Sequence, residues 1–169
     1  LGEDKNNKKK IIKMLKMINY RGPDEIKSIS FKNFNGGVVR LAIEAIENGS
    51  QPIQNEKLIV GFNGEIFNYK SLINKFKLKL ERNSEIDVIA HLYNLLGDKF
   101  VHEINGQFAI FIFDKSKNQL LLFRDPYGIR PLFYYLNKNN FYFASEMKSI
   151  IAASNDKFEI DLNSIAQTA

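Results

Sequence analysis

The sequence predicts an α+β domain in which antiparallel strands form a sandwich with helices outside. The main observation is a series of short apolar or aromatic runs separated by turn residues, which predicts a meander of strands at 107–113, 120–124, 132–136 and 141–144. Because these runs are apolar on both sides, both faces of the sheet should be covered. A helix expected at 146–153 would be part of that cover. At 169 residues, the chain is long enough for one such domain.

The composition excludes several classes of protein. With 44% hydrophobic and 25% charged residues, it is typical of a soluble globular protein. No apolar run approaches the roughly 20 residues of a membrane span, and the lysine-rich start lacks the apolar core of a secretory signal, so we expect a cytoplasmic location and no membrane partner. The chain has no Cys, and its two His, His91 and His102, match no metal spacing, so we expect no disulfide and no metal.

The net charge of +5 comes largely from lysines, many of them within 5–10 and 75–79. A nucleic-acid surface would explain this charge. However, no aromatic-interleaved basic stretch and no recognisable nucleic-acid module accompanies the lysines. A solvated face is the better interpretation, and we expect no nucleic-acid partner.

The first half of the chain mixes helices and strands. Apolar residues at helical spacing predict helices at 11–18, which Pro23 must end, and at 69–74. Strands are expected at 26–31, 38–43, 58–60 and, from the alternation of apolar residues with lysines, at 76–80. Turn residues at 33–37 and a loop at 48–52 separate these elements.

A better marked helix follows residue 84. Ser84, with Asp87 three residues later, resembles a capping box; an apolar face continues to Leu96, and Gly97 is expected to end the helix. Glu85 then lies in the first turn, where the positive end of the helix dipole favours a carboxylate.

The pair Asn63-Gly64, shortly after the strand at 58–60, has two interpretations. Asn-Gly between apolar segments is a strong signal for a hairpin turn. The functional alternative is an oxyanion site, in which the Asn63 carboxamide and the Gly64 amide aim two donors at one developing negative charge.

Two other patterns favour structural interpretations. Arg124-Asp125 could belong to a phosphate or metal site, but a salt bridge that braces a turn between strands is favoured. Tyr134, Tyr135 and Tyr142 could stack bases, but in alternating strand runs they are expected to belong to the core.

Several separated motifs stand in the order found in class II glutamine amidotransferase domains. They are Arg21-Gly22-Pro23-Asp24, Arg40-Leu41-Ala42-Ile43, Gly49-Ser50-Gln51-Pro52, Asn63-Gly64-Glu65-Ile66-Phe67-Asn68, Gly106-Gln107-Phe108-Ala109, Arg124-Asp125-Pro126-Tyr127-Gly128-Ile129-Arg130-Pro131-Leu132 and Phe143-Ala144-Ser145-Glu146-Met147-Lys148. The chain resembles this family over nearly its whole length, and in particular the glutaminase domain of glutamine-hydrolysing asparagine synthetases.

The resemblance implies an N-terminal-nucleophile hydrolase fold, a four-layer αββα sandwich with two antiparallel sheets between helix layers. It also implies hydrolysis of the glutamine side-chain amide to glutamate and ammonia by the thiol of an N-terminal Cys, whose amino group acts as general base. The ammonia would pass to an ATP-dependent synthetase domain that makes asparagine from aspartate. ATP and Mg would belong to that domain, so no cofactor is expected here.

The resemblance also implies roles for individual residues. Asn63 and Gly64 correspond to the oxyanion hole, and Arg40 corresponds to the arginine that clamps the substrate α-carboxylate. Glu65 matches a residue near the α-amino end of the substrate. The alternatives are a surface salt bridge for Arg40 and a carboxylate that only anchors the turn for Glu65.

Two departures from the family pattern matter. The family aspartate that holds the substrate ammonium is replaced by Glu85, which keeps the charge but moves the carboxylate. The family begins Cys-Gly-Ile, whereas this chain begins Leu1-Gly2 and has no Cys, so we expect a truncated start and no acyl-enzyme from the chain as written. The synthetase half is expected after Ala169, on a separate chain, or nowhere.

The alternatives to a glutaminase are a catalytically inactive module of the same fold that binds glutamine or a partner, and the glutaminase domain of another amidotransferase. The sequence leaves a homodimer open.

Overall fold

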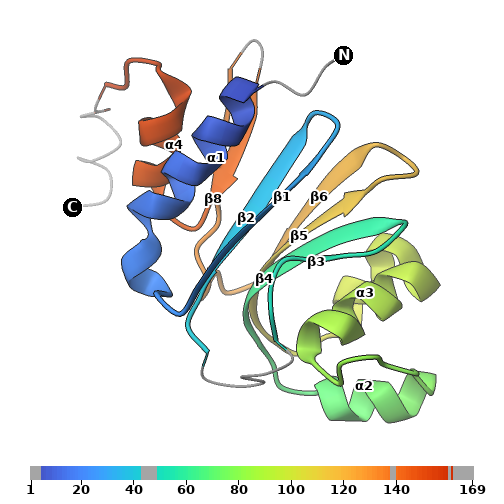
Figure 1. The fold of residues 1–169 in the computed structure, drawn as a ribbon. Helices are drawn as coiled ribbons and strands as arrows, with labels where there is room; N and C mark the ends of the chain where they lie inside the picture. Colours follow the sequence, from blue (N-terminus) through green and yellow to red (C-terminus); the bar gives the residue numbers. More distant parts are fainter. Residues whose placement is uncertain (1–4, 43–48, 138–139, 160, 162–169) are drawn as a thin grey trace.

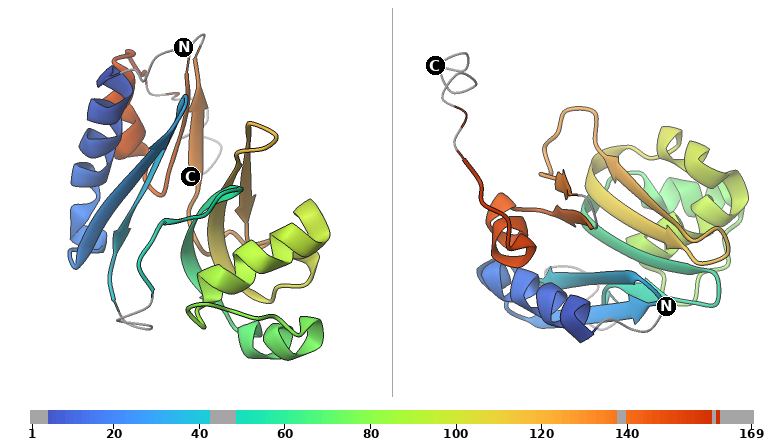
Figure 2. Two further views of the ribbon diagram at one scale, coloured as in Figure 1. Left: turned by 45° about the vertical axis from the view of Figure 1, so that its right-hand side comes forward. Right: turned by 90° about the horizontal axis from the view of Figure 1, so that it is seen from above.

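The computed structural model describes residues 5–42, 49–137, 140–159 and 161. Its elements form four stacked layers, with helices outside and antiparallel strands inside, which confirms the predicted sandwich (Figure 1 and Figure 2). The start Leu1-Gly2, the predicted strand end at Ile43, the first residue of the loop at 48–52 and the end 162–169 lie outside the described residues.

The two outer layers are helical. On one side, α1 (Lys5–Met17) and α4 (Met147–Ser154) pack against each other although they come from opposite ends of the chain. On the other side lie α2 (Tyr69–Phe76) and α3 (Glu85–Leu96). The short 3-10 helices η1 (Asn19–Arg21) and η2 (Gly97–His102) follow α1 and α3. Among the described residues, no helix is long and apolar enough to cross a membrane.

The two inner layers are antiparallel sheets. Two hairpins lie on the α1 side: β1 (Glu25–Phe31) with β2 (Phe34–Arg40), and β7 (Phe133–Leu136) with β8 (Phe141–Ala144). Facing them is one four-stranded sheet in spatial order β3 (Ile53–Gln54), β4 (Leu58–Ile66), β5 (Gly106–Asp114) and β6 (Gln119–Arg124). Within the described residues, the α1 side is therefore two small sheets where one continuous sheet was expected.

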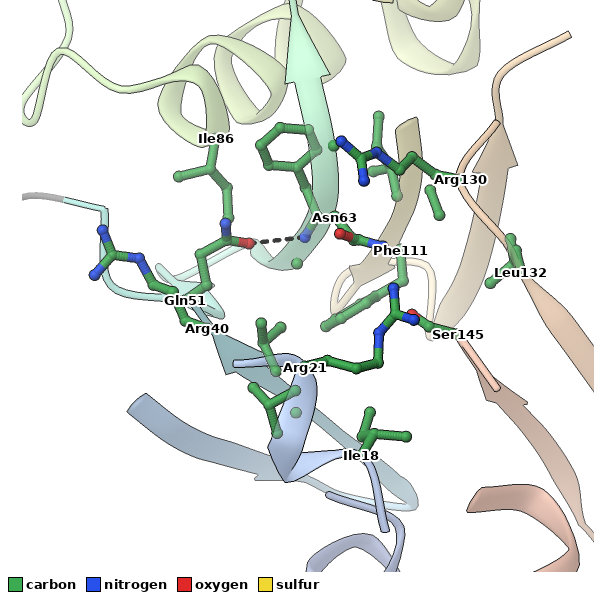
Figure 3. Close-up of a pocket in the computed structure, with 18 of the residues that line it drawn as sticks. Ile18, Arg21, Arg40, Gln51, Asn63, Ile86, Phe111, Arg130, Leu132 and Ser145 are labelled. Carbon is green, nitrogen blue, oxygen red and sulfur yellow. Dashed lines mark hydrogen bonds between the residues drawn. The ribbon is translucent and has the colours of Figure 1, made fainter. Parts of the chain in front are cut away.

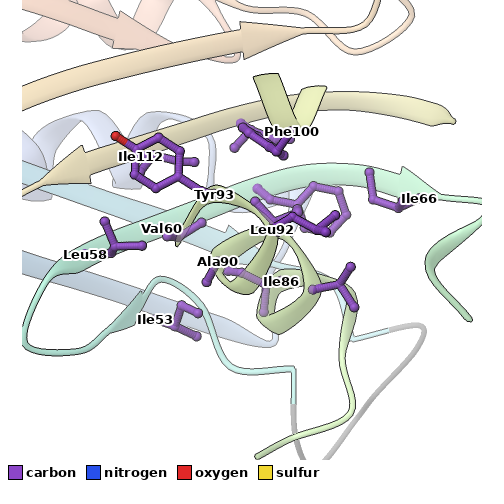
Figure 4. Packing of buried hydrophobic residues seen from close by; sticks show 14 of the residues in the cluster. Ile53, Leu58, Val60, Ile66, Ile86, Ala90, Leu92, Tyr93, Phe100 and Ile112 are labelled. Carbon is purple, nitrogen blue, oxygen red and sulfur yellow. The ribbon is translucent and has the colours of Figure 1, made fainter. Parts of the chain in front are cut away.

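Alternation along the central strands divides the interior into two cores, because successive side chains of a strand point to opposite faces. Phe108, Ile110 and Ile112 of β5 pack with α3 on one face (Figure 4). On the other face, Phe111 and Phe113 contact the β1–β2 hairpin, where the ring centroids of Phe34 and Phe113 are 4.5 Å apart. A third cluster joins α1 and α4 to β8 through Met14, Tyr142, Ile150 and Ala153.

Most predicted elements are confirmed. The helix expected at 11–18 is α1, which starts earlier, at Lys5. The four strands and the helix predicted in the second half agree with β5, β6, β7, β8 and α4 to within one residue at each end. Apolar runs bounded by turn residues are strong local signals for strands, which is why these elements were predicted closely.

Three predictions are wrong. The turn expected at 33–37 is only Lys32-Asn33, and the rest belongs to β2. No strand forms at 76–80; Lys77 ends α2 in the left-handed conformation, with φ 50°, and Leu78 and Leu80 pack singly against the α3 core. The tyrosines were all expected in the core, yet Tyr134 is 72% exposed while Tyr142 is buried. Tyr142 lies on the face of β7–β8 that packs on α1 and α4. On the opposite face Phe143 packs against Phe111, but Tyr134 does not join that cluster.

Candidate active site

A cavity of about 500 Å³ opens between the two facing strand layers (Figure 3). Residues of β2, β4, β5 and β8 line it, together with α1, η1 and the start of α3. The five residues singled out in the sequence all line this one cavity: Arg40, Asn63, Gly64, Glu65 and Glu85. They come from β2, β4 and α3, so the fold brings residues that are distant in the sequence to one cavity.

Asn63-Gly64 does not form a hairpin turn, and that interpretation is wrong. Both residues lie inside β4, where Asn63 pairs with Ala109 and Gly64 with Phe108 of β5 without a break in register. Asn63 follows Ile59 and Gly61 on the face of β4 that looks toward β2. Its side chain therefore reaches the cavity, and its buried Nδ2 has no hydrogen-bond partner in the described part of the chain.

The amide of Gly64 points toward the same free edge of β4. Phe62 and Ile66 direct their amides away from β5: Phe62 N donates to Gln51 Oε1 at 2.8 Å, and Ile66 N to Glu85 Oε1 at 2.5 Å. Since amide direction alternates along an antiparallel strand, Gly64 N–H, between these two, faces that edge as well.

Glycine is required at position 64. Its φ of 144° is a conformation that side chains rarely adopt, and a Cβ built there would lie 1.9 Å from the Gln107 carbonyl oxygen. The backbone of β4 can come this close to β5 only without a side chain.

Arg40 is the last residue of β2 and shares a face with Phe34 and Val38, which pack toward the central sheet. The Arg-Gly-Pro-Asp motif fixes its backbone: Asp24 N donates to Arg40 O at 3.1 Å, and Pro23 forms a bridge with Arg40. Its side chain is 12% exposed, and Nη1 lies 3.9 Å from Glu25 Oε2. Arg40 is therefore a largely buried guanidinium at one wall of the cavity, not a surface ion pair.

The Gly-Ser-Gln-Pro motif supports this wall. Ser50 Oγ donates to Glu25 Oε1 at 2.6 Å and accepts from Lys27 Nζ at 3.1 Å. The next residue, Gln51, holds Phe62 N on the edge of β4. The motif thus ties the β1–β2 hairpin to the strand that carries Asn63.

The two predicted carboxylates lie near the start of α3. Glu85 is its first residue, and its bond to Ile66 N joins the helix to β4. Glu65 is exposed at the cavity mouth. The predicted capping box is wrong in its bonds, although α3 does begin after Ser84: Ser84 Oγ caps no amide, and Asp87 Oδ2 accepts from Arg82 N instead, at 2.8 Å.

Buried polar atoms without partners concentrate at this cavity. The described chain has four such side-chain atoms, and three belong to cavity-lining residues: Asn63 Nδ2, Ser84 Oγ and Arg130 Nε. Folded proteins rarely leave buried polar atoms unpaired, because each one costs about 1 to 3 kcal/mol. Their concentration at one place indicates a site built to hydrogen-bond a polar ligand. No cluster of His, Asp or Glu in the described residues is arranged to hold a metal.

A polar cluster closes the cavity at η1. Arg21 Nη1 and Lys148 Nζ lie 3.0 and 3.1 Å from the carboxylate oxygens of Glu146, the residue before α4. The hydrogen bond from the Tyr20 hydroxyl is the largest of the effects that lower the pKa of Glu146 to about 2, and both cations act in the same direction. Arg21 is thus an anchored cation that ties η1 to α4.

Sequence reasoning missed two cavity residues, Ser84 and Arg130. Arg130 stands in a motif that was taken only to brace a turn. That turn is braced, but by backbone hydrogen bonds of Arg124 and Asp125 in place of the predicted salt bridge. The proline after Arg130 restricts the backbone of Arg130 but says nothing of its side chain, so the sequence held no clear signal for this residue.

A family of glutamine amidotransferase domains matches residues 1–169. The chain belongs to this family. The amidotransferase domain is 40% identical, over 86% of its length, to a putative glutamine-hydrolysing asparagine synthetase 2 of Methanocaldococcus jannaschii. It is 42% identical, over 82% of its length, to asparagine synthetase 2 of Bacillus subtilis, and 36% identical, over 80%, to the rat asparagine synthetase. It spans only 32%, 19% and 26% of these three proteins.

A solved structure confirms the fold of the amidotransferase domain. The glutamine phosphoribosylpyrophosphate amidotransferase of B. subtilis superimposes with a TM-score of 0.60 at 25% sequence identity, over 70% of this chain and 29% of that chain. The expected N-terminal-nucleophile hydrolase sandwich is therefore the observed one.

Proposed function

We propose that this domain binds glutamine in the cavity and hydrolyses its side-chain amide to glutamate and ammonia. The observation that carries the proposal is the pair of neighbouring donors on β4. Asn63 Nδ2 lacks a partner among the described residues, and the Gly64 N–H faces the edge of β4 away from β5. Attack on an amide carbon turns the carbonyl oxygen into an anion, and two fixed donors in a buried site stabilise that charge without reorganisation. The glutamine-hydrolysing relatives support this reaction.

The remaining cavity residues suit the other groups of glutamine. Arg40 is assigned to the α-carboxylate, since a planar guanidinium can donate two parallel hydrogen bonds to it. Glu65 and Glu85 are assigned to the α-ammonium. Glu85 accepts from Ile66 N through Oε1, which holds its carboxylate beside β4 at the cavity.

The nucleophile is proposed to be the thiol of a cysteine at the N-terminus, with its amino group as general base. The 169 residues contain no cysteine. In this form the cavity would bind glutamine without forming an acyl-enzyme. The second candidate function is a binding module of the same fold, without catalysis, that holds glutamine or a partner.

Ammonia is proposed to serve the ATP-dependent synthesis of asparagine from aspartate in a separate domain, as the names of the relatives suggest. ATP would bind that domain and not this cavity. The cytoplasmic location is likewise a prediction.

Glutamate release from glutamine tests the proposal. The domain would be produced with Cys-Gly-Ile ahead of Leu1 and a free N-terminal cysteine, and compared with a control that carries Ser-Gly-Ile. We expect glutamate from the cysteine form and at least a 100-fold lower rate from the serine form. Absence of glutamate from a folded cysteine form that still binds glutamine would leave the binding module as the function.

A further inference from the structure

Arg130 is a cation of the cavity to which the proposed function gives no role. Its backbone is fixed from both sides. Asp125 Oδ2 accepts from Arg130 N at 3.0 Å, and Arg124 Nε donates to Arg130 O at 3.0 Å. The neighbouring turn is held in the same way, since Arg124 Nη2 donates to Gly128 O at 2.6 Å. The turn therefore presents residue 130 in a defined direction.

The side chain of Arg130, in contrast, lacks polar partners in the described part of the chain. Its Nε is buried without a hydrogen-bond partner, and its guanidinium forms no hydrogen bond or ion pair with any residue that the structure describes. The other two arginines of the cavity differ, because Arg21 pairs with Glu146 and Arg40 lies near Glu25. A partly buried guanidinium without a carboxylate is unfavourable unless a ligand completes it.

The position of Arg130 indicates which group of the ligand it would contact. Arg130 and Arg40 both line the cavity, and Figure 3 shows them on opposite sides of Asn63. If Arg40 holds the α-carboxylate and Asn63 the side-chain oxygen, then Arg130 lies beyond the side-chain end. A guanidinium only donates hydrogen bonds, so it suits an oxygen and repels an ammonium.

We infer that Arg130 binds the γ end of the ligand, namely the side-chain oxygen of glutamine and the γ-carboxylate of glutamate. The inference rests on the proposed function. It adds a residue whose affinity for the ligand depends on the charge of the γ group. A cation there attracts the γ-carboxylate of glutamate more strongly than the neutral amide of glutamine. The same charge favours the oxyanion that forms during hydrolysis.

Calorimetric binding of L-glutamine and L-glutamate to the 169-residue chain tests this inference without requiring catalysis. Arg130→Gln should weaken glutamate binding by about 10- to 100-fold, the usual range for a hydrogen bond to a charged group, and glutamine binding by less than about 5-fold. Arg82→Gln is the matched control, because it removes the same charge outside the cavity, and it should leave both affinities unchanged.

The outcomes separate the two proposals. Equal weakening of both ligands would assign Arg130 to the α-carboxylate, and no weakening of either would remove it from the site; both results overturn the inference. If the unchanged chain binds neither ligand, the proposed function itself fails. Since the Arg130 side chain has no hydrogen-bond or ion-pair partner among the described residues, Arg130→Gln should unfold at the same temperature as the unchanged chain. Arg130→Lys, which keeps the charge, should retain part of the preference for glutamate.

Discussion

The two faces of the central sheet are built from alternate residues of the same strands. They differ in how completely they are packed and in how many of their polar atoms have hydrogen-bond partners. On the α3 face, Phe100, Ile89 and Ile112 are fully buried in a closed apolar core. The opposite face is equally packed around Phe111 and Phe113 but opens beyond them into a cavity with unpaired polar atoms. One strand register thus serves stability on one side and lines the proposed glutamine site on the other.

The largest effect on stability should come from the closed face. Phe100 is fully buried and makes edge contacts with the rings of Tyr93 and Phe123. Phe100→Ala should lower the free energy of unfolding by about 3 to 5 kcal/mol, through lost burial and the cavity left behind. Urea denaturation measures this change. Leu95→Ala, at an exposed position of α3, should change little. Equal losses in both variants would show that the α3 face is not the closed core.

Gly64→Ala tests the boundary between the two faces. The backbone conformation and the contact with the Gln107 carbonyl both oppose a side chain, so the free energy of unfolding should fall by about 1 to 3 kcal/mol from backbone strain alone. Gly97→Ala is the control: it also has a positive φ, but nothing lies within 4 Å of its Cβ position. Chemical denaturation of both variants should show the larger loss at position 64; the reverse order would contradict the close approach of β4 and β5.

The closed face also predicts a pH dependence. Burial acts to raise the pKa of Asp114, but hydrogen bonds from Ser116 and Lys117 outweigh it and lower the pKa from 3.8 to about 2. A carboxylate with a lowered pKa in the folded state stabilises the protein above about pH 4 and loses this contribution as the pH falls toward 2.

Asp114→Asn should therefore flatten the decline of unfolding free energy between pH 5 and pH 2 by on the order of 2 kcal/mol. Equilibrium unfolding at several pH values measures the slope. The exposed Asp98→Asn serves as the control for the change in charge. A slope that Asp114→Asn leaves unchanged would show that this carboxylate is not stabilised by folding.

The smallest change in stability is expected at Asn63. Its Nδ2 makes no hydrogen bond in the described structure, so Asn63→Ala should leave the free energy of unfolding unchanged or raise it slightly. Asn68→Ala is the matched control, because that side chain bonds Asn105 N and Glu103 O, each at 2.9 Å, and should cost about 1 to 2 kcal/mol. Thermal unfolding of the two variants compares them; a loss at Asn63 as large as at Asn68 would mean that its carboxamide is structural.

The sequence predicted the closed parts of the molecule better than the open ones. Along β5, apolar residues on both sides were enough to predict a strand covered on both faces, because packing follows directly from alternation. Asn63-Gly64 was ambiguous, because a turn and a polar interruption of a buried strand have the same local composition. The long pairing of β4 with β5 decides for the strand. Local sequence propensity cannot predict this pairing, because β4 and β5 are far apart in the sequence.

The site was predicted only in part for a similar reason. The five expected residues were chosen from motifs shared with the amidotransferase family, and all five line one cavity. Ser84 and Arg130 escaped because their local patterns have ordinary structural meanings, a helix cap and a braced turn. Only the missing hydrogen bonds of their side chains, which depend on tertiary neighbours, distinguish them.

The most direct test of the glutamine site is the turnover of Asn63→Ala beside Asn68→Ala, both carrying Cys-Gly-Ile ahead of Leu1. Glutamate release should fall by about 100- to 1000-fold in Asn63→Ala, the usual loss for one oxyanion donor, although this variant folds as well as the parent. Asn68→Ala should be less stable but retain its rate below its unfolding temperature. Unchanged turnover in Asn63→Ala would contradict the assignment of the cavity as a glutaminase site.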